Sequence, residues 1–182
     1  MPERAMNHAG NARSGSDHAI ALSGTQPAAS LNSESPLPRK VRLFAVDDHP
    51  VVRKGLRMFL NLQPDMDLCG EAVGVSTAKQ GIDAAKPELV IVDLGLEDGD
   101  GFELIEWIRR HHPQIKILVF TSRDDLASAS RAFQCGAHGY VVKSDGTREL
   151  AHVIRLILQN QRFLSNRVAQ KGDLSHCLSV ES

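Results

Sequence analysis

The chain has 182 residues, of which 42% are hydrophobic, and its formal net charge is −1 at pH 7. This length accommodates one ordinary domain with a tail, and a charge so close to zero gives no electrostatic reason for the chain as a whole to bind nucleic acid or an anionic membrane. The three cysteines form no C-x-x-C pair and no apolar stretch approaches the ~20 residues of a membrane span, so we expect a cytoplasmic protein without a disulfide framework, a zinc site or a membrane segment.

The chain divides into three parts by composition. Residues 1–38 contain no Phe, Trp or Tyr and are rich in Ser, Gly, Ala, Asn and Pro. Such a segment cannot bury enough apolar surface to offset the entropy lost on ordering, so it is predicted to be a disordered N-terminal tail. The foldable part is predicted at residues 39–160, and residues 161–182 are predicted to form a C-terminal linker or tail.

From Val41 onward, short apolar runs alternate with segments of helical spacing. Helix boundaries carry recognisable signals, since Pro50 suits a first helical turn, Pro87 stops a helix and Gly136 ends one. In chain order the pattern predicts a strand at 41–46, a helix at 50–60, a strand at 67–73, a helix at 76–86, a strand at 89–94, a helix at 102–112, a strand at 115–121, a helix at 124–136, a strand at 139–142 and a helix at 147–160.

Five strands that each precede a helix predict an α/β fold of the doubly wound class. Strands that are apolar throughout belong to a parallel sheet that is covered by helices on both faces. The crossovers are expected to be right-handed. In this class, ligand chemistry gathers at the carboxyl ends of the strands, so the polar residues at those ends are the candidates for function.

Polar residues end, or directly follow, four of the five predicted strands. They are Asp47 and Asp48, Asp93, Thr121 and Lys143. Each alone has an ordinary structural explanation, because an Asp can cap a helix or shape a turn and a Lys can be a solvated loop charge. Chance alone would not place all of them at one edge of the sheet, and together they predict a site.

The chemistry of this set is coherent. Three clustered carboxylates repel one another unless a cation lies among them, and hard oxygen ligands suit Mg²⁺. A carboxylate can also attack phosphorus and form an aspartyl phosphate. Phosphoryl transfer needs mainly positioning and neutralisation of charge, which Mg²⁺, a lysine and a hydroxyl group can supply.

Three stretches of the sequence resemble one family. DDHPVVRKGL, DLGLEDGDGFELI and GAHGYVVKS are similar to segments of the receiver domain of bacterial two-component response regulators, closest to the NarL/FixJ type. The resemblance covers about residues 41–160. It implies a flavodoxin-like, doubly wound, five-stranded parallel sheet with strand order 2-1-3-4-5 and helices on both faces.

The resemblance also implies roles for the strand-end residues. Asp93 would be the phosphoacceptor, and Lys143 and Thr121 would bind the phosphoryl group. Mg²⁺ would be held by Asp48, by Asp93 and by the backbone carbonyl of Gly95.

Three further consequences come from the resemblance. Asp47 would act on Mg²⁺ through water, Tyr140 and Thr121 would form a switch, and the switched surface would comprise the fourth helix, the fifth strand and the fifth helix. This chain departs from the family pattern at two positions, Glu97 and Ser144, where many receivers carry proline. Neither residue is expected to contact a reacting group.

The implied partner is a sensor histidine kinase, and a homodimer is possible. Residues 162–170 resemble the linker that leads to a helix-turn-helix domain, but only 22 residues follow Asn160 and they carry no three-helix pattern. We therefore expect no direct binding of nucleic acid or membrane by this chain. It would be either a natural single-domain receiver or a truncated regulator.

Two alternatives from other classes remain. A phosphatase similar to the haloacid dehalogenases would carry a second Asp two residues after its nucleophile, where this chain has Gly95. A pseudo-receiver, which is a protein-binding module without chemistry, would normally lack Asp48, Asp93 or Lys143, and all three are present. The favoured interpretation is a phosphoacceptor that is not an enzyme in the ordinary sense but takes part in its own phosphorylation and dephosphorylation.

Overall fold

A computed structural model describes residues 39–146, 149–172 and 174, so the predicted tail at residues 1–38 lies outside the described residues. The strands form one parallel sheet with the order β2-β1-β3-β4-β5-β6. The strands are β1 (Val41–Val46), β2 (Met66–Ala72), β3 (Leu89–Val92), β4 (Lys116–Thr121), β5 (Gly139–Val142) and β6 (Phe163–Leu164). The helices are α1 (Pro50–Asn61), α2 (Val75–Ala85), α3 (Gly101–His111), α4 (Leu126–Cys135), the 3-10 helix η1 (Lys143–Asp145), α5 (Leu150–Leu158) and α6 (Asn166–Ala169).

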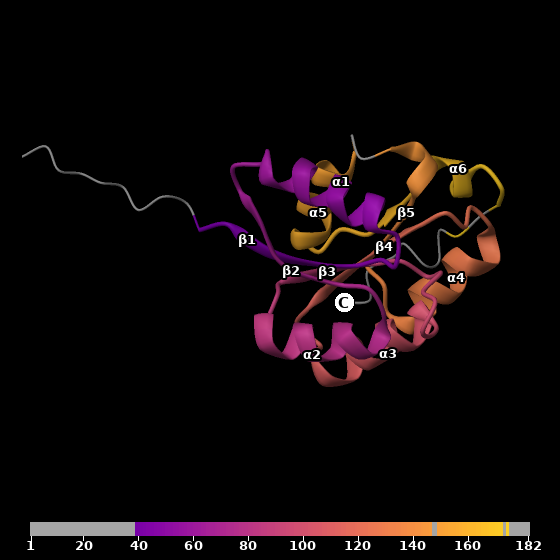
Figure 1. Cartoon of the computed structure of the whole chain (residues 1–182). Coiled ribbons are helices and arrows are strands. Elements are labelled where there is room, and N and C mark those ends of the chain that lie inside the picture. The colour runs from indigo at the N-terminus through magenta and orange to yellow at the C-terminus, as the bar shows by residue number, and fades with distance from the viewer. Residues whose placement is uncertain (1–38, 147–148, 173, 175–182) are drawn as a thin grey trace, which may run out of the picture. The chain divides into compact units, whose positions relative to one another are not determined.

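Helices cover both faces of the sheet (Figure 1). α1 and α5 lie on one face, and α2, α3 and α4 lie on the other. Side chains alternate between the two faces along each strand, so the core has two separate clusters. In β1, for example, Leu43 and Ala45 pack on the α1/α5 side, whereas Phe44 and Val46 pack on the opposite side. The doubly wound α/β class, the strand order 2-1-3-4-5 and the parallel direction are thus confirmed.

The predicted helix boundaries agree with the structure within a few residues. Asp100 and Asp125 cap α3 and α4, since their carboxylates accept hydrogen bonds from Phe102 N at 3.0 Å and Ser128 N at 2.7 Å. Gly136 ends α4 with φ of 106°, a conformation that favours glycine. None of the helices in the described residues combines the length and apolar character that a membrane crossing needs.

The structure adds two elements to the five predicted units. β6 pairs with β5 as a sixth strand, and the short helix α6 follows it, both within the segment predicted to be a linker or tail. A strand of two residues and a helix of four are too short to produce a hydrophobic period, which is why the sequence pattern missed them. The last predicted helix begins at Leu150 in the structure, and residues 147–148 lie outside the described residues.

Candidate functional site

Asp47 and Asp93 lie side by side at the carboxyl ends of β1 and β3. The sheet hydrogen bonds continue past the strand ends, because Asp47 N donates to Ala72 O at 3.2 Å and Asp93 N donates to Val46 O at 2.9 Å. Both carboxylates are buried, with residue exposures of 1% for Asp47 and 4% for Asp93. Two buried carboxylates at this spacing require compensating charge.

Lys143 supplies part of that charge. It is the first residue of η1, directly after β5, and its ammonium group lies 2.7 Å from Asp47 Oδ2 and 2.6 Å from Asp93 Oδ2. Burial acts to lower the pKa of Lys143, but the hydrogen bonds to Asp47 and Asp93 outweigh it and the pKa is raised. The side chain therefore stays charged and ties β5 to the ends of β1 and β3.

The remaining carboxylate oxygens suit a divalent cation. Asp48 Oδ1 and Asp93 Oδ1 are buried and accept no hydrogen bond from the residues that the structure describes. Ligand atoms of Asp47, Asp48, His49 and Asp93 all lie within 4.8 Å of one another. Three carboxylates and one ammonium group leave a formal charge of −2, and unpaired carboxylate oxygens are the donors that Mg²⁺ prefers, so the residues present fit a magnesium ion.

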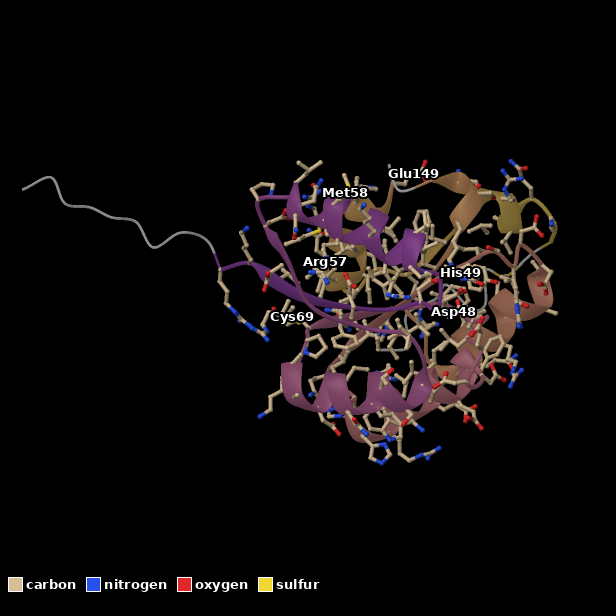
Figure 2. All side chains as sticks on the ribbon, in the orientation of Figure 1. Asp48, His49, Arg57, Met58, Cys69 and Glu149 are labelled. Carbon is tan, nitrogen blue, oxygen red and sulfur yellow. The ribbon has the colours of Figure 1, made fainter. Side chains whose placement is uncertain are left out.

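His49, the residue after the acidic pair, lies beside this cluster. Figure 2 shows Asp48 and His49 together beyond the end of β1. His49 Nδ1 is 2.6 Å from Asp48 Oδ1, close enough for an ion pair with a protonated ring, although the angles are not those of a hydrogen bond. The side chain is 64% exposed, so it can leave the carboxylate without disturbing the core.

The helix-cap explanation for the acidic pair is not what the structure shows. His49 is the N-cap of α1 and makes no side-chain cap hydrogen bond. Asp47 Oδ1 accepts from His49 N at 2.9 Å, and Arg53 Nη1 donates to the Asp47 carbonyl oxygen at 2.6 Å. Asp47 thus orders the entry to α1 by bonding to the residue before the helix.

Thr121 ends β4 on the opposite side of the site. It is 1% exposed and lies in register with Val142, the residue before Lys143. Its hydroxyl oxygen accepts a long hydrogen bond of 3.4 Å from Arg123 N. Thr121 therefore has a weak local partner that it could exchange for another.

Tyr140 in β5 is fully buried, and its ring belongs to the core cluster on the α4 side. Its hydroxyl group donates to the Arg123 carbonyl oxygen at 2.9 Å. Burial is the main reason that the pKa of Tyr140 is raised, and the charge of Asp125 adds to it. Thr121 and Tyr140 thus contact the amide nitrogen and the carbonyl oxygen of the same loop residue.

Two glycines lie close to Asp93. A Cβ added to Gly95 would lie 3.9 Å from Asp93 Oδ2, which places this backbone at the rim of the acidic cluster. A Cβ added to Gly101 would collide with the Asp93 carbonyl oxygen and would lie 2.7 Å from Leu94 Cα. Gly101 therefore lets the first turn of α3 pack directly on the chain that carries Asp93.

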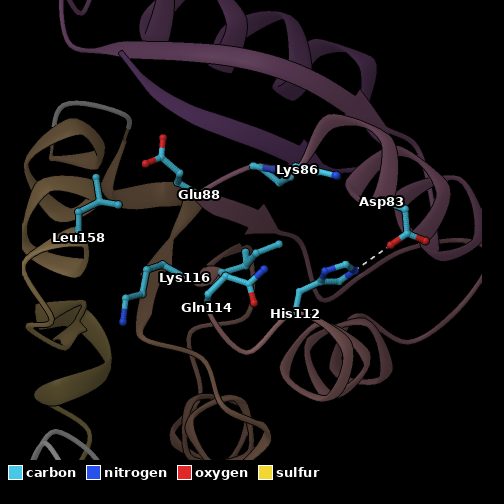
Figure 3. A pocket seen from close by; sticks show the side chains of 9 residues that line it. Asp83, Lys86, Glu88, His112, Gln114, Lys116 and Leu158 are labelled. Atoms are coloured by element: carbon cyan, nitrogen blue, oxygen red, sulfur yellow. Dashed lines mark hydrogen bonds and ion pairs between the residues drawn. The ribbon is translucent and has the colours of Figure 1, made fainter. Parts of the chain in front are cut away.

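The larger of two described cavities is remote from these groups. It has a volume of about 540 Å³, and its lining includes the pair of His112 Nε2 and Asp83 Oδ1 at 2.8 Å (Figure 3). Its lining includes Glu88 and Lys116, whose backbones lie at the amino ends of β3 and β4. A smaller cavity of about 190 Å³ lies beside Lys143, and its other lining residues are Val52, Gly55, Leu56 and Phe120.

Comparison with known families gives one clear match. The family model described as the response regulator receiver domain matches residues 43–155. This range contains all the residues of the acidic cluster together with Thr121, Tyr140 and Lys143.

Three individual proteins illustrate the similarity. The DNA-binding transcriptional activator DevR/DosR of Mycobacterium tuberculosis is 37% identical over 129 residues, which are 71% of this chain and 59% of that protein. The response regulator protein VraR of Staphylococcus aureus is 33% identical over 147 residues, which are 76% of this chain and 70% of VraR. The crystal structure of a LuxR-family two-component response regulator from an Aurantimonas species is 36% identical, with a TM-score of 0.69, over 72% of this chain and 94% of that one.

Proposed function

The chain belongs to the response regulator receiver domain family, and on that premise we propose that Asp93 accepts a phosphoryl group from a phosphohistidine on a sensor histidine kinase. The observation that carries this proposal is the state of the Asp93 carboxylate. It is buried, one oxygen is held by Lys143 at 2.6 Å, and the other has no hydrogen-bond partner among the described residues. A carboxylate that a lysine holds in place has two oxygens that can take separate roles, one toward the metal ion and one as the nucleophile.

The transfer is a substitution at phosphorus. A carboxylate oxygen of Asp93 forms the new bond to phosphorus while the bond from phosphorus to the imidazole nitrogen breaks. The electron pair of that bond returns to the imidazole, which takes a proton from solvent. Lys143 stays within reach of the new acyl phosphate and offsets its negative charge, and Thr121 offers a hydroxyl donor from the neighbouring strand.

Mg²⁺ is the cofactor in this proposal. Asp48 and Asp93 would bind it through their carboxylates, Gly95 through its backbone carbonyl and Asp47 through water. When bound, the ion would neutralise charge on the phosphoryl oxygens. The indirect role for Asp47 is supported by its own contacts, since Oδ2 pairs with Lys143 and Oδ1 accepts from His49 N.

The output is proposed to be a shift between two conformations. Thr121 would exchange its 3.4 Å contact with Arg123 N for one with the phosphoryl group, and Arg123 would transmit the change to Tyr140 through its carbonyl oxygen. The Tyr140 ring is buried in this structure. In the proposed switch, phosphorylation therefore either holds the ring in this buried position or releases it. The affected surface comprises α4, β5 and α5.

Phosphorylation by a small phosphodonor tests the proposal. Incubation with acetyl phosphate and Mg²⁺ should add one phosphoryl group to the wild-type protein, measured by intact mass, and Asp93→Asn should abolish the addition. Asp83→Asn is the matched control, because Asp83 is a paired aspartate at the opposite end of the sheet. If Asp93→Asn were labelled as readily as the wild type, the nucleophile would be another residue. If the wild type were not labelled, the chain would be a pseudo-receiver.

The wider role rests on the relatives. DevR/DosR is named as a DNA-binding transcriptional activator, and this chain spans 59% of its length. We propose that the receiver controls transcription when it is joined to, or binds, a DNA-binding output domain, and that its own described residues signal through protein contacts, homodimerisation included. A comparison of oligomeric state with and without phosphorylation, by light scattering, tests this part.

A further inference from the structure

The segment after α5 folds back onto the receiver and extends its sheet. We call residues 163–172, which comprise β6, α6 and the turn after it, the C-terminal strap. Phe163 N donates to His138 O at 3.2 Å and Ser165 N donates to Tyr140 O at 2.8 Å. The strap therefore occupies the edge of β5 that would otherwise be open.

The strap is also held against α4. Val168 is fully buried and joins the core cluster on the α4 side of the sheet. Lys171 Nζ pairs with Asp124 Oδ2 at 2.9 Å, and the Leu126 side chain packs so closely on Gly172 that it would have to shift to admit a Cβ there. These contacts give the strap a defined place on the surface formed by α4 and β5.

A third attachment reaches the turn after β5. The Ser165 hydroxyl group donates to Asp145 Oδ2, and Arg167 Nε donates to Asp145 Oδ1 at 2.9 Å. Burial acts to raise the pKa of Asp145, but the hydrogen bonds from Ser165 and Arg167 outweigh it and the pKa is lowered. Both oxygens of Asp145 are thus used by the strap.

Asp145 and Lys143 are the two ends of the same three-residue helix, η1. The turn is closed by Gly146 N, which donates to Lys143 O at 3.2 Å. Lys143 holds one end of this turn to Asp47 and Asp93, while Asp145 holds the other end to the strap. Only Ser144 separates Lys143 from Asp145, so few rotatable backbone bonds lie between them. A movement of Asp145 therefore also moves the Lys143 backbone.

We infer that Asp145 is a positioning residue for Lys143, and that the C-terminal strap fixes the turn that places the ammonium group between Asp47 and Asp93. The strap is therefore part of the site, although it makes no contact with the reacting groups. The effect of the strap on phosphoryl transfer rests on the proposed function. Its effect on the turn does not.

The first experiment needs neither Mg²⁺ nor a phosphodonor. Hydrogen–deuterium exchange of the turn amides, Gly146 N in particular, is measured in the wild type, in Ser165→Ala and in Arg167→Ala. Each variant removes one of the two attachments to Asp145, so exchange at the turn should be roughly threefold to tenfold faster. Arg167→Lys, which keeps a cation at this position, should restore much of the protection.

Lys171→Ala is the matched control. It removes one positive charge from the strap, as Arg167→Ala does, but cuts the pair with Asp124 instead of the bond to Asp145. Exchange at the turn should then remain at the wild-type rate, because the β6 hydrogen bonds and the buried Val168 still hold the strap in place. Equal exchange in the wild type, Ser165→Ala and Arg167→Ala would overturn the inference, and so would an increase in Lys171→Ala as large as that in Arg167→Ala.

The second experiment separates positioning from general weakening of the structure. A looser Lys143 places less positive charge beside the acidic cluster, so Ser165→Ala should bind Mg²⁺ roughly twofold or more tightly by titration calorimetry. The same variant should be labelled more slowly by acetyl phosphate, because Lys143 no longer offsets the phosphoryl charge. General weakening would reduce both quantities, and that result would overturn the inference. If the wild type were not labelled at all, the proposed function would fail while the exchange and Mg²⁺ results would still decide the role of the strap.

Discussion

The ammonium group of Lys143 lies 2.6 Å from the Asp93 carboxylate, and the same group lies 2.7 Å from Asp47. One side chain therefore connects the end of β5 to the ends of β1 and β3. Neither β1 nor β3 is a neighbour of β5 in the sheet. The pair is formed inside the protein, since only 13% of the Lys143 side chain is exposed. Without a metal ion, Lys143 is the main neutralising charge for these two carboxylates.

Lys143→Ala should therefore destabilise the metal-free protein. Removing one partner of a buried ion pair leaves uncompensated charge, and the free energy of unfolding should fall by about 3 kcal/mol. Urea unfolding at pH 7 in the presence of a chelator measures the loss. Arg57→Ala is the control, because the Arg57 side chain is 59% exposed in its pair with Glu71 and should contribute little to stability. Equal losses in the two variants would show that the Lys143 pairs are not buried in solution.

Mg²⁺ should stabilise the wild type and fail to stabilise Asp48→Asn. An ion that binds only the folded state adds about 2.7 kcal/mol at a hundred times its dissociation constant. Asp48 offers an unpaired buried oxygen for that ion, and an amide at this position removes the charge that attracts it. Thermal unfolding at increasing Mg²⁺ concentration measures the effect, and a shift in Asp48→Asn equal to that of the wild type would contradict the assignment.

His49 should weaken Mg²⁺ binding, whereas Asp48 should strengthen it. Its ring nitrogen lies 2.6 Å from Asp48 Oδ1, the oxygen proposed to bind the ion, so the His49 ring occupies space that Mg²⁺ needs. His49→Gln should therefore bind Mg²⁺ more tightly than the wild type. Titration calorimetry of the two proteins measures the difference, and equal affinity would exclude the competition.

Gly101 and Gly55 form a matched pair of glycine tests. Gly101→Ala would force a Cβ against the Asp93 peptide, so we expect a loss of about 2 kcal/mol and a weaker Mg²⁺ site. Gly55 lies inside α1 with nothing within 4 Å of an added Cβ, so Gly55→Ala should gain about 0.5–1 kcal/mol from helix propensity. Chemical denaturation of both variants measures the two signs, and a gain in both would show that α3 can move away from Asp93.

Most of the fold was predictable because the strands are apolar throughout and the helices are amphipathic. Every residue of β3 and β5 is buried, so both stand out as continuous apolar runs. The acidic residues, Thr121 and Lys143 follow such runs directly, and parallel strands bring their carboxyl ends to one edge. The meeting of Asp47, Asp93 and Lys143 therefore follows from pattern and topology together.

What could not be predicted depends on contacts between distant segments. Ser165 and Asp145 are 20 residues apart, and neither belongs to a periodic element that would bring them together. The buried position of Tyr140 depends on the packing around α4, and the contact of His49 with Asp48 depends on a side-chain rotamer. Only the folded structure specifies these three relationships.

The stability of the protein should fall below pH 6.5 in part because of His138. Burial is the main reason that the pKa of His138 is lowered to about 4, and the charges of Lys116, Arg109 and Arg162 add to it. The neutral ring is also required structurally, since Nδ1 accepts a hydrogen bond from Ile117 N at 3.1 Å. A folded-state pKa below the unfolded value of about 6.5 means that the unfolded chain binds the proton more readily. This contribution is therefore fully present above pH 6.5 and is lost as the pH falls toward 4.

His138→Asn isolates this contribution, because an amide oxygen can accept the hydrogen bond from Ile117 N without titrating. The wild type should lose about 1–2 kcal/mol more than the variant between pH 7 and pH 5, since the partial exposure of the ring reduces the full linkage effect. Urea unfolding of both proteins at the two pH values measures the difference, and carboxylate contributions common to both cancel. Parallel pH profiles would show that His138 is protonated equally in the folded and unfolded states, and the hydrogen bond from Ile117 would then be absent in solution.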